Sequence, residues 1–142
     1  MKVIVVTGGS SGMGEATARE MAKRGWKVAI VFQKNRARAE KVARECGDAL
    51  PVQADVAQDA DCVRAAKEVL ARWGRIDALV NSAGTTKFAD HKELGGLSAD
   101  DFLGIFRVNL IGPFQMIRAC EAALRESGGA VVNISSVAHL LG

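Results

Sequence analysis

The chain has 142 residues, with no tyrosine and only two histidines and three cysteines. Cys46, Cys62 and Cys120 stand alone, with no Cys-x-x-Cys pair and no histidine at ligand spacing. These absences exclude the common zinc-binding patterns, and we expect no metal site. An odd cysteine count without a secretion signal indicates reduced, intracellular thiols, so we expect a cytoplasmic protein.

A strong net charge and long apolar runs are absent as well. Lysine and arginine total 19 against 16 acidic residues, and the net charge of +3 is too weak and too scattered to indicate a nucleic-acid-binding surface. The apolar stretch Val3–Val6 is too short to cross a membrane and lacks the layout of a signal peptide. A hydrophobic content of 49% is typical of a folded protein. We expect one domain over residues 1–142, with neither nucleic acid nor a membrane as partner.

Short β-branched runs alternate with longer stretches of helical periodicity. The predicted strands are Val3–Val6, Val28–Phe32, a short strand around Val52, Ile76–Val80 and Ala130–Ile134. The predicted helices are Met13–Arg24, Ala37–Cys46, one with Val63, Ala66, Leu70 and Trp73 on its inner face, and a long one from Ser98 or Asp100 to Ser127. This alternation predicts an α/β fold, a doubly wound, Rossmann-like parallel sheet with helices on both faces.

The long helix carries a proline that should interrupt it. We expect one side to hold Phe102, Ile105, Phe106, Asn109, Pro113, Ile117, Cys120 and Leu124. Pro113 has no N–H, so the Asn109 carbonyl loses its partner four residues later and the helix should kink there. The freed carbonyl can bind a water molecule, or the proline simply bends the helix around the core. The preceding stretch, Thr85–Leu97, shows no clear period and is predicted to be mostly loop.

A glycine-rich turn joins the first strand to the first helix, with the sequence Thr7-Gly8-Gly9-Ser10-Ser11-Gly12-Met13-Gly14. Glycine permits a tight turn and lets a pyrophosphate approach the backbone. The helix N-terminus then offers free N–H groups and a favourable dipole to the anion. A plain strand–helix turn is the alternative, but the position after the first strand and before a helix favours dinucleotide binding.

This turn resembles the cofactor fingerprint of the short-chain dehydrogenase/reductase family, Thr-Gly-x-x-x-Gly-x-Gly. Four further segments match in order over essentially the whole chain: Asp55-Val56, Asn81-Ser82-Ala83-Gly84, Val108-Asn109 and Asn133-Ile134-Ser135-Ser136. Ser82 stands where the family usually has a second asparagine. Each motif alone is weak, but five in the right order and on the right elements identify the chain as similar to the N-terminal part of this family.

The resemblance implies a set of site residues. The expected cofactor-binding residues are Thr7, Gly8, Ser10, Ser11, Gly12, Met13, Gly14, Gln33, Lys34, Arg36, Asp55, Val56, Asn81, Ala83 and Gly84. Ser136 matches the catalytic serine, which positions the substrate oxygen, and the backbone of Asn109 matches a water site in the proton-relay path. From the residues alone, a strand-end serine that caps a turn is the alternative for Ser136. His91 and His139 are expected to have surface or structural roles.

The cofactor is expected to be NADP(H), with NAD(H) left open. An acidic residue at the end of the second strand would bind the ribose 2′-OH of NAD, whereas a basic environment accepts the 2′-phosphate of NADP. That place holds Phe32, no acidic residue follows before Glu40, and Lys34 and Arg36 lie nearby. The alternative is that these two cations are solvated charges. Ser11, where many NADP-preferring relatives carry arginine, also leaves NAD open.

The resemblance further implies a Tyr-x-x-x-Lys pair on a helix beyond Gly142, where tyrosine is the general acid/base. A complete domain of this type has roughly 200–250 residues. We therefore expect a fragment, truncated after the fifth strand and with that strand as an open edge. It is an incompletely recorded protein, one half of a nicked chain or a true truncation.

Three functions stay open. The intact protein is expected to transfer a hydride between NADP(H) or NAD(H) and a small-molecule carbonyl/alcohol substrate. The alternatives are a truncated module or pseudoenzyme that binds a dinucleotide without turnover, and a structural partner that docks a second chain. The family's long helix commonly contributes to oligomer interfaces, so a homo-oligomer is expected. The substrate and the reaction direction cannot be read from the sequence.

Overall fold

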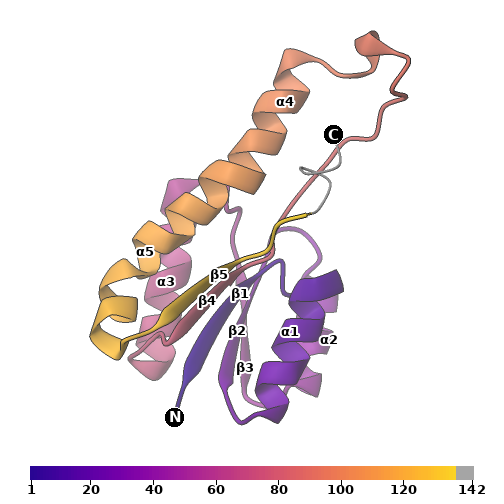
Figure 1. The fold of residues 1–142 in the computed structure, drawn as a ribbon. Helices are drawn as coiled ribbons and strands as arrows, with labels where there is room; N and C mark the ends of the chain where they lie inside the picture. Colours follow the sequence, from indigo (N-terminus) through magenta and orange to yellow (C-terminus); the bar gives the residue numbers. More distant parts are fainter. Residues whose placement is uncertain (137–142) are drawn as a thin grey trace.

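The computed structural model describes residues 1–136, which form a parallel five-stranded sheet covered by helices on both faces (Figure 1). The strand order is β3-β2-β1-β4-β5, so the chain winds outward from β1 in both directions. The strands are β1 (Val3–Thr7), β2 (Lys27–Phe32), β3 (Ala49–Gln53), β4 (Ala78–Asn81) and β5 (Ala130–Asn133). The predicted doubly wound α/β fold is confirmed.

The helices divide between the two faces of the sheet (Figure 1). They are α1 (Gly12–Lys23), α2 (Arg36–Glu45), α3 (Asp59–Trp73), α4 (Ala99–Phe106) and α5 (Gly112–Ser127). Helices α1 and α2 cover one face, and α3 and α5 cover the other. A short 3₁₀ turn, Leu94–Gly96, interrupts the predicted loop, and a π-helical turn, Arg107–Ile111, joins α4 to α5.

The central strand β1 is buried along its whole length because both of its faces carry helices. Val3 and Val5 belong to the core beneath α3 and α5, whereas Ile4 and Val6 belong to the core beneath α1 and α2. A strand covered on both faces needs an apolar residue at every position. This explains why the run Val-Ile-Val-Val shows no polar alternation.

The predicted inner face of α3 is confirmed for Ala66, Leu70 and Trp73 and is wrong for Val63. Its buried residues are Cys62, Ala65, Ala66 and Val69, whereas the side chain of Val63 is 37% exposed. Alanine and cysteine are small enough to let α3 lie close to α5 and the sheet, so these small residues, rather than Val63, mark the contact face. Leu70 and Trp73 pack at the margin of this core, as expected.

The predicted long helix is divided, and the phenylalanines of its first part do not lie in the core. Phe102 and Phe106 are 53% and 54% exposed. The reason is that α4 extends past the carboxyl ends of the strands, where no other element of the described chain covers it (Figure 1). In α5 the expected Cys120 and Leu124 are buried, together with Met116.

Among residues 1–136, no helix has the length and apolar character needed to cross a membrane. The fifth strand forms one edge of the sheet, and its residues are exposed.

Asp77 ties the start of β1 to the start of β4 from a nearly buried position. Its carboxylate accepts a hydrogen bond from the Val3 N–H at 2.8 Å and another from Arg75 Nε at 2.9 Å. The Arg75 hydrogen bond, assisted by that from Val3, outweighs desolvation and holds the pKa of Asp77 below its ordinary value of 3.8.

We expect Asp77→Ala to lower the free energy of unfolding by about 1–3 kcal/mol, because the Val3 N–H loses its partner in a buried place. The matched control is Asp48→Ala, which removes exposed ion pairs with Lys27 and Arg72. It should lower the free energy of unfolding by less than about 1 kcal/mol. Urea unfolding measures both. Because the folded pKa of Asp77 is lowered, its contribution should be complete above pH 3.8 and vanish as the pH falls through the folded value. Equal losses in the two variants would contradict this role.

Candidate functional site

The glycine-rich turn places an open helix N-terminus at the carboxyl end of β1. Gly8 has φ +65° and Gly12 has φ +54°, a region that favours glycine. Ser11 is the N-cap of α1, and its side chain makes no capping hydrogen bond. Ser11 therefore leaves the first N–H groups of α1 without a capping side chain, which is the arrangement that binds an anion.

The loop after β4 lies directly against this turn. The Thr7 hydroxyl oxygen accepts hydrogen bonds from the N–H groups of Ser82 and Ala83, at 3.1 and 3.0 Å. A Cβ added to Gly8 would stand 2.9 Å from the Ala83 Cα, and one added to Gly14 would collide with the Gly8 backbone. Gly8 and Gly14 are therefore required by close backbone contacts.

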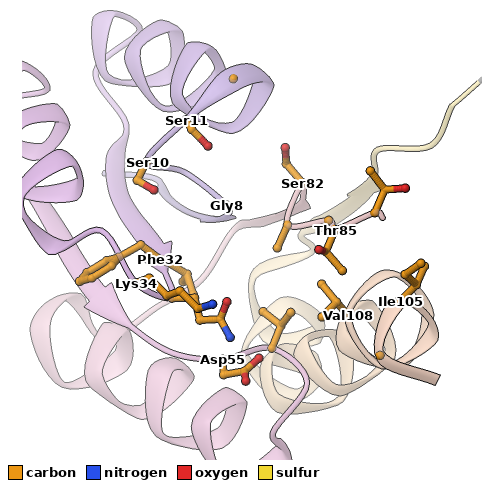
Figure 2. Close-up of a pocket in the computed structure, with 18 of the residues that line it drawn as sticks. Gly8, Ser10, Ser11, Phe32, Lys34, Asp55, Ser82, Thr85, Ile105 and Val108 are labelled. Atoms are coloured by element: carbon orange, nitrogen blue, oxygen red, sulfur yellow. The ribbon is translucent and has the colours of Figure 1, made fainter. Parts of the chain in front are cut away.

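A cavity of about 630 Å³ opens beside the turn, between the ends of four strands and α4. Its lining includes the expected Gly8, Ser10, Ser11, Gly12, Met13, Gln33, Lys34, Asp55, Val56, Ala83 and Gly84. It also includes Ser82, Thr85, Thr86, Lys87, Asp100, Asp101, Gly104, Ile105 and Val108, which the sequence did not single out as site residues. Figure 2 shows Phe32 and Lys34 at one end of the cavity and Ile105 and Val108 at the other.

Two expected cofactor-binding residues, Thr7 and Asn81, support the cavity from beneath rather than line it. Both are buried at the carboxyl ends of neighbouring strands, where they are partners in the β1–β4 register. Asn81 Nδ2 donates a hydrogen bond to Asn133 Oδ1 on β5 at 2.9 Å. Within the described residues, the buried Asn81 Oδ1 has no hydrogen-bond partner.

The two cations after β2 occupy different surroundings. Lys34 lines the cavity. Arg36 does not: its Nη2 donates a hydrogen bond to Gln53 Oε1 at 2.9 Å, and its guanidinium lies 5.5 Å from the centre of the Phe32 ring. The structure therefore brings Lys34, but not Arg36, to the cavity.

Asp55 follows β3 at the floor of the cavity (Figure 2). Its N–H donates a hydrogen bond to Asp61 Oδ2 at 2.8 Å, and its Oδ1 accepts one from the Ala57 N–H at 3.0 Å. The tight turn Asp55–Ala57 thereby places Asp55 and Val56 in the lining of the cavity.

Asn109 lies in the π-helical turn, so the α-helical hydrogen-bonding pattern is interrupted before Pro113, whereas the expected kink stays a prediction. The Gly112 N–H donates to the carbonyl of Arg107, five residues earlier, as in a π-helix. The Asn109 side chain does not line the cavity: Nδ2 donates to the Thr85 carbonyl, and Oδ1 accepts from the Thr85 N–H, both at 2.8 Å. It thereby fixes the loop that forms one wall of the cavity. A water molecule on the Asn109 carbonyl stays a prediction.

Ser136 lies three residues beyond the end of β5 and is exposed. It is not among the described residues that line the cavity. Its catalytic role therefore stays a prediction. His139 lies outside the described residues, and His91 is exposed in the loop before α4. Over residues 1–136, no group of histidine, cysteine, aspartate and glutamate side chains could hold a metal ion.

Comparison with protein families identifies the family of the chain. The sequence model of the short chain dehydrogenase family matches residues 2–142. The chain belongs to this family.

Three solved structures show how far the likeness extends. A short-chain dehydrogenase/reductase from Burkholderia xenovorans is 44% identical with a TM-score of 0.95, over 99% of this chain and 61% of that one. A 3-ketoacyl-(acyl-carrier-protein) reductase from Brucella melitensis, complexed with NADH, is 37% identical with a TM-score of 0.89, over 96% and 57%. An alcohol dehydrogenase from Thermococcus sibiricus, complexed with 5-hydroxy-NADP, is 31% identical with a TM-score of 0.82, over 94% and 57%.

The chain spans between 50% and 58% of the length of the curated relatives that it matches.

One pair of residues in the cavity wall, Lys87 and Asp101, is fixed by a pattern that is visible in the sequence. Asp101 forms a capping box with Ser98 at the start of α4, which confirms Ser98 rather than Asp100 as the N-cap. Lys87 Nζ lies 2.8 Å from Asp101 Oδ2. The Lys87 hydrogen bond, followed by those from Ser98, lowers the pKa of Asp101 to about 2. A serine followed by aspartate three residues later is a helix-start pattern, and it could have marked Asp101 as a fixed part of the wall.

We expect Gly8→Ala to destabilise the protein more than Gly12→Ala. Both substitutions place alanine in the left-handed region, at a cost of roughly 1–2 kcal/mol. Only Gly8→Ala adds a collision, with the Ala83 backbone, because the space around Gly12 is open. Thermal unfolding of the two variants measures the difference. A Gly12→Ala variant with the lower Tm would show that the contact between the two loops is not required.

Proposed function

We propose that the chain is the cofactor-binding part of an oxidoreductase that transfers a hydride between a nicotinamide dinucleotide, NADP(H) or NAD(H), and a carbonyl/alcohol substrate. The observation that carries this proposal is the open N-terminus of α1 at the edge of a 630 Å³ cavity. The related reductase complexed with NADH and the alcohol dehydrogenase complexed with 5-hydroxy-NADP support it.

The residues present fit such a cofactor. The bare backbone of the glycine turn and the free N–H groups of α1 would hold the pyrophosphate. Asp55 and Val56 would contact the adenosine half, and the loop after β4 would line the way toward the nicotinamide half. When bound, the nicotinamide ring supplies or accepts the hydride. The role of the chain is to orient the cofactor and to surround it with a shaped wall.

The family resemblance implies that a tyrosine is the general acid in the catalytic proton transfer. These 142 residues contain no tyrosine. We therefore propose, as a second candidate, that the 142-residue chain by itself binds the dinucleotide without turnover. Ser136 and Asn109 would act in the reaction only with the remaining catalytic groups, Ser136 on the substrate oxygen and Asn109 through its backbone. A cytoplasmic location also stays a prediction.

Binding and turnover are measured separately. Calorimetric titration of the chain with NADPH and with NADH measures binding and tests the cofactor site. Oxidation of NADPH, followed at 340 nm with a panel of ketones and aldehydes, tests catalysis. Binding without oxidation supports the second candidate, oxidation supports the first for this chain itself, and absence of binding contradicts both.

We expect NADPH to bind more tightly than NADH, with Lys34 responsible for the difference. Lys34 lines the cavity, whereas Arg36 is bound to Gln53. Lys34→Gln should weaken NADPH binding by about tenfold, the size expected for a charge-assisted contact to a phosphate, and leave NADH almost unchanged. Arg36→Gln is the matched control and should change either affinity by less than about twofold. Tighter binding of NADH to the wild type would overturn the NADP preference.

The homo-oligomer is proposed to form through the outer face of the helix that carries Asn109. Phe102, Phe106, Leu110 and Phe114 recur every four residues and are all more than half exposed. Contiguous apolar surface of this kind marks an interaction site, and two copies related by a two-fold axis would cover each other's stripe.

Phe106→Ser should shift the protein toward the monomer, measured by sedimentation equilibrium. Phe88→Ser is the control, since Phe88 is 94% exposed but lies outside the stripe. A wild type that stays monomeric at high concentration would refute the proposed interface.

A further inference from the structure

Helix α5 is joined to the turn Asp55–Ala57 by more than apolar packing. A Cβ added to Gly112 would lie 2.8 Å from Val56 Cγ2, so the Val56 side chain packs against the bare helix backbone. Three residues further along α5, Gln115 Nε2 donates a hydrogen bond to the Val56 carbonyl at 2.7 Å. The same carbonyl accepts a weaker one from Cys62 Sγ at 3.4 Å.

Gln115 is unusual for its place. It is 8% exposed, and its neighbours on the inner face of α5 are Gly112, Met116, Cys120 and Leu124. An amide in such surroundings costs free energy unless it is hydrogen-bonded, and an apolar side chain of similar length would fill the space without that cost. The contact with Val56 is therefore the feature that distinguishes glutamine at this position from an ordinary core residue.

The peptide group between Val56 and Ala57 is held at both ends. Its carbonyl accepts from Gln115, and its N–H donates to Asp55 Oδ1 at 3.0 Å. A peptide group is planar, so fixing the direction of the carbonyl also fixes the direction of the N–H. The N–H in turn fixes the orientation of the Asp55 carboxylate, which lines the cavity.

We infer that Gln115 is a positioning residue for the adenosine half of the cofactor, acting through the Val56–Ala57 peptide group on the Asp55 carboxylate. This inference rests on the proposed function of the cavity. Gln115 itself does not touch the cavity. Loss of its N–H leaves the Val56 carbonyl with only the weaker hydrogen bond from Cys62, so the peptide group and the carboxylate are held less firmly before the ligand binds. The cost of ordering the carboxylate then appears as weaker binding.

The test uses ADP-ribose, which contains the adenosine half and both phosphates but no nicotinamide, with affinity measured by calorimetry. Gln115→Met keeps the length of the side chain and removes the donor, and should weaken binding by about threefold to tenfold. Arg118→Met is the matched control on the same helix: it breaks an exposed pair with Asp59 and should leave affinity unchanged.

A double-mutant cycle with Asp55→Ala separates positioning from general damage. If Gln115 acts through the carboxylate, the effect of Gln115→Met should fall to less than about twofold once Asp55 is alanine. Circular dichroism shows which variants keep the fold, and only those variants are compared. The inference fails if a folded Gln115 variant binds ADP-ribose like the wild type, or if its loss persists unchanged in the Asp55→Ala background. Failure of the wild type to bind ADP-ribose, NADH or NADPH would instead overturn the proposed function.

Discussion

Two stretches of backbone, the glycine-rich turn after β1 and the loop after β4, lie closer together than side chains would allow. The Thr7 hydroxyl oxygen holds the second stretch through two N–H groups, and the absence of a Cβ at Gly8 permits the approach. Because β1 and β4 are neighbours in a parallel sheet, the two stretches leave the sheet at the same edge. The cavity opens beside this contact, so its shape depends on backbone geometry more than on any one lining side chain.

Much of this arrangement could be predicted from the sequence. Strands buried on both faces appear as unbroken apolar runs such as Val3–Val6, and each is followed by a recognisable turn. Parallel strands bring their carboxyl ends to one edge, so the glycine turn, Asp55 and Ala83 could be placed in one site before any coordinates were known. The proline at position 113 likewise predicted an irregular helix at Asn109, since its effect is local.

The remaining features depend on contacts between distant residues. Periodicity placed Val63 on the inner face of α3, but the packing of α3 against α5 selects the neighbouring, smaller Cys62 instead. Lys34 and Arg36 are equivalent in the sequence, and only the partner Gln53, 17 residues further along, separates them. The sequence does not reveal the role of Gln115, because a glutamine in a helix is ordinarily a surface residue and its partner Val56 lies 59 residues away.

The π-helical turn Arg107–Ile111 determines how far α4 is rotated about the helix axis relative to α5, which follows it directly. On its C-terminal side, Met116 and Cys120 face the sheet; on its N-terminal side, Gly104 and Ile105 face the cavity. Each residue of an α-helix turns the chain by roughly 100°. Removing one residue from the turn would rotate α4 by about that angle while leaving α5 in place. The orientation of the cavity wall relative to the core is thus set at the π-helical turn, where a change of one residue would turn Gly104 and Ile105 away from the cavity.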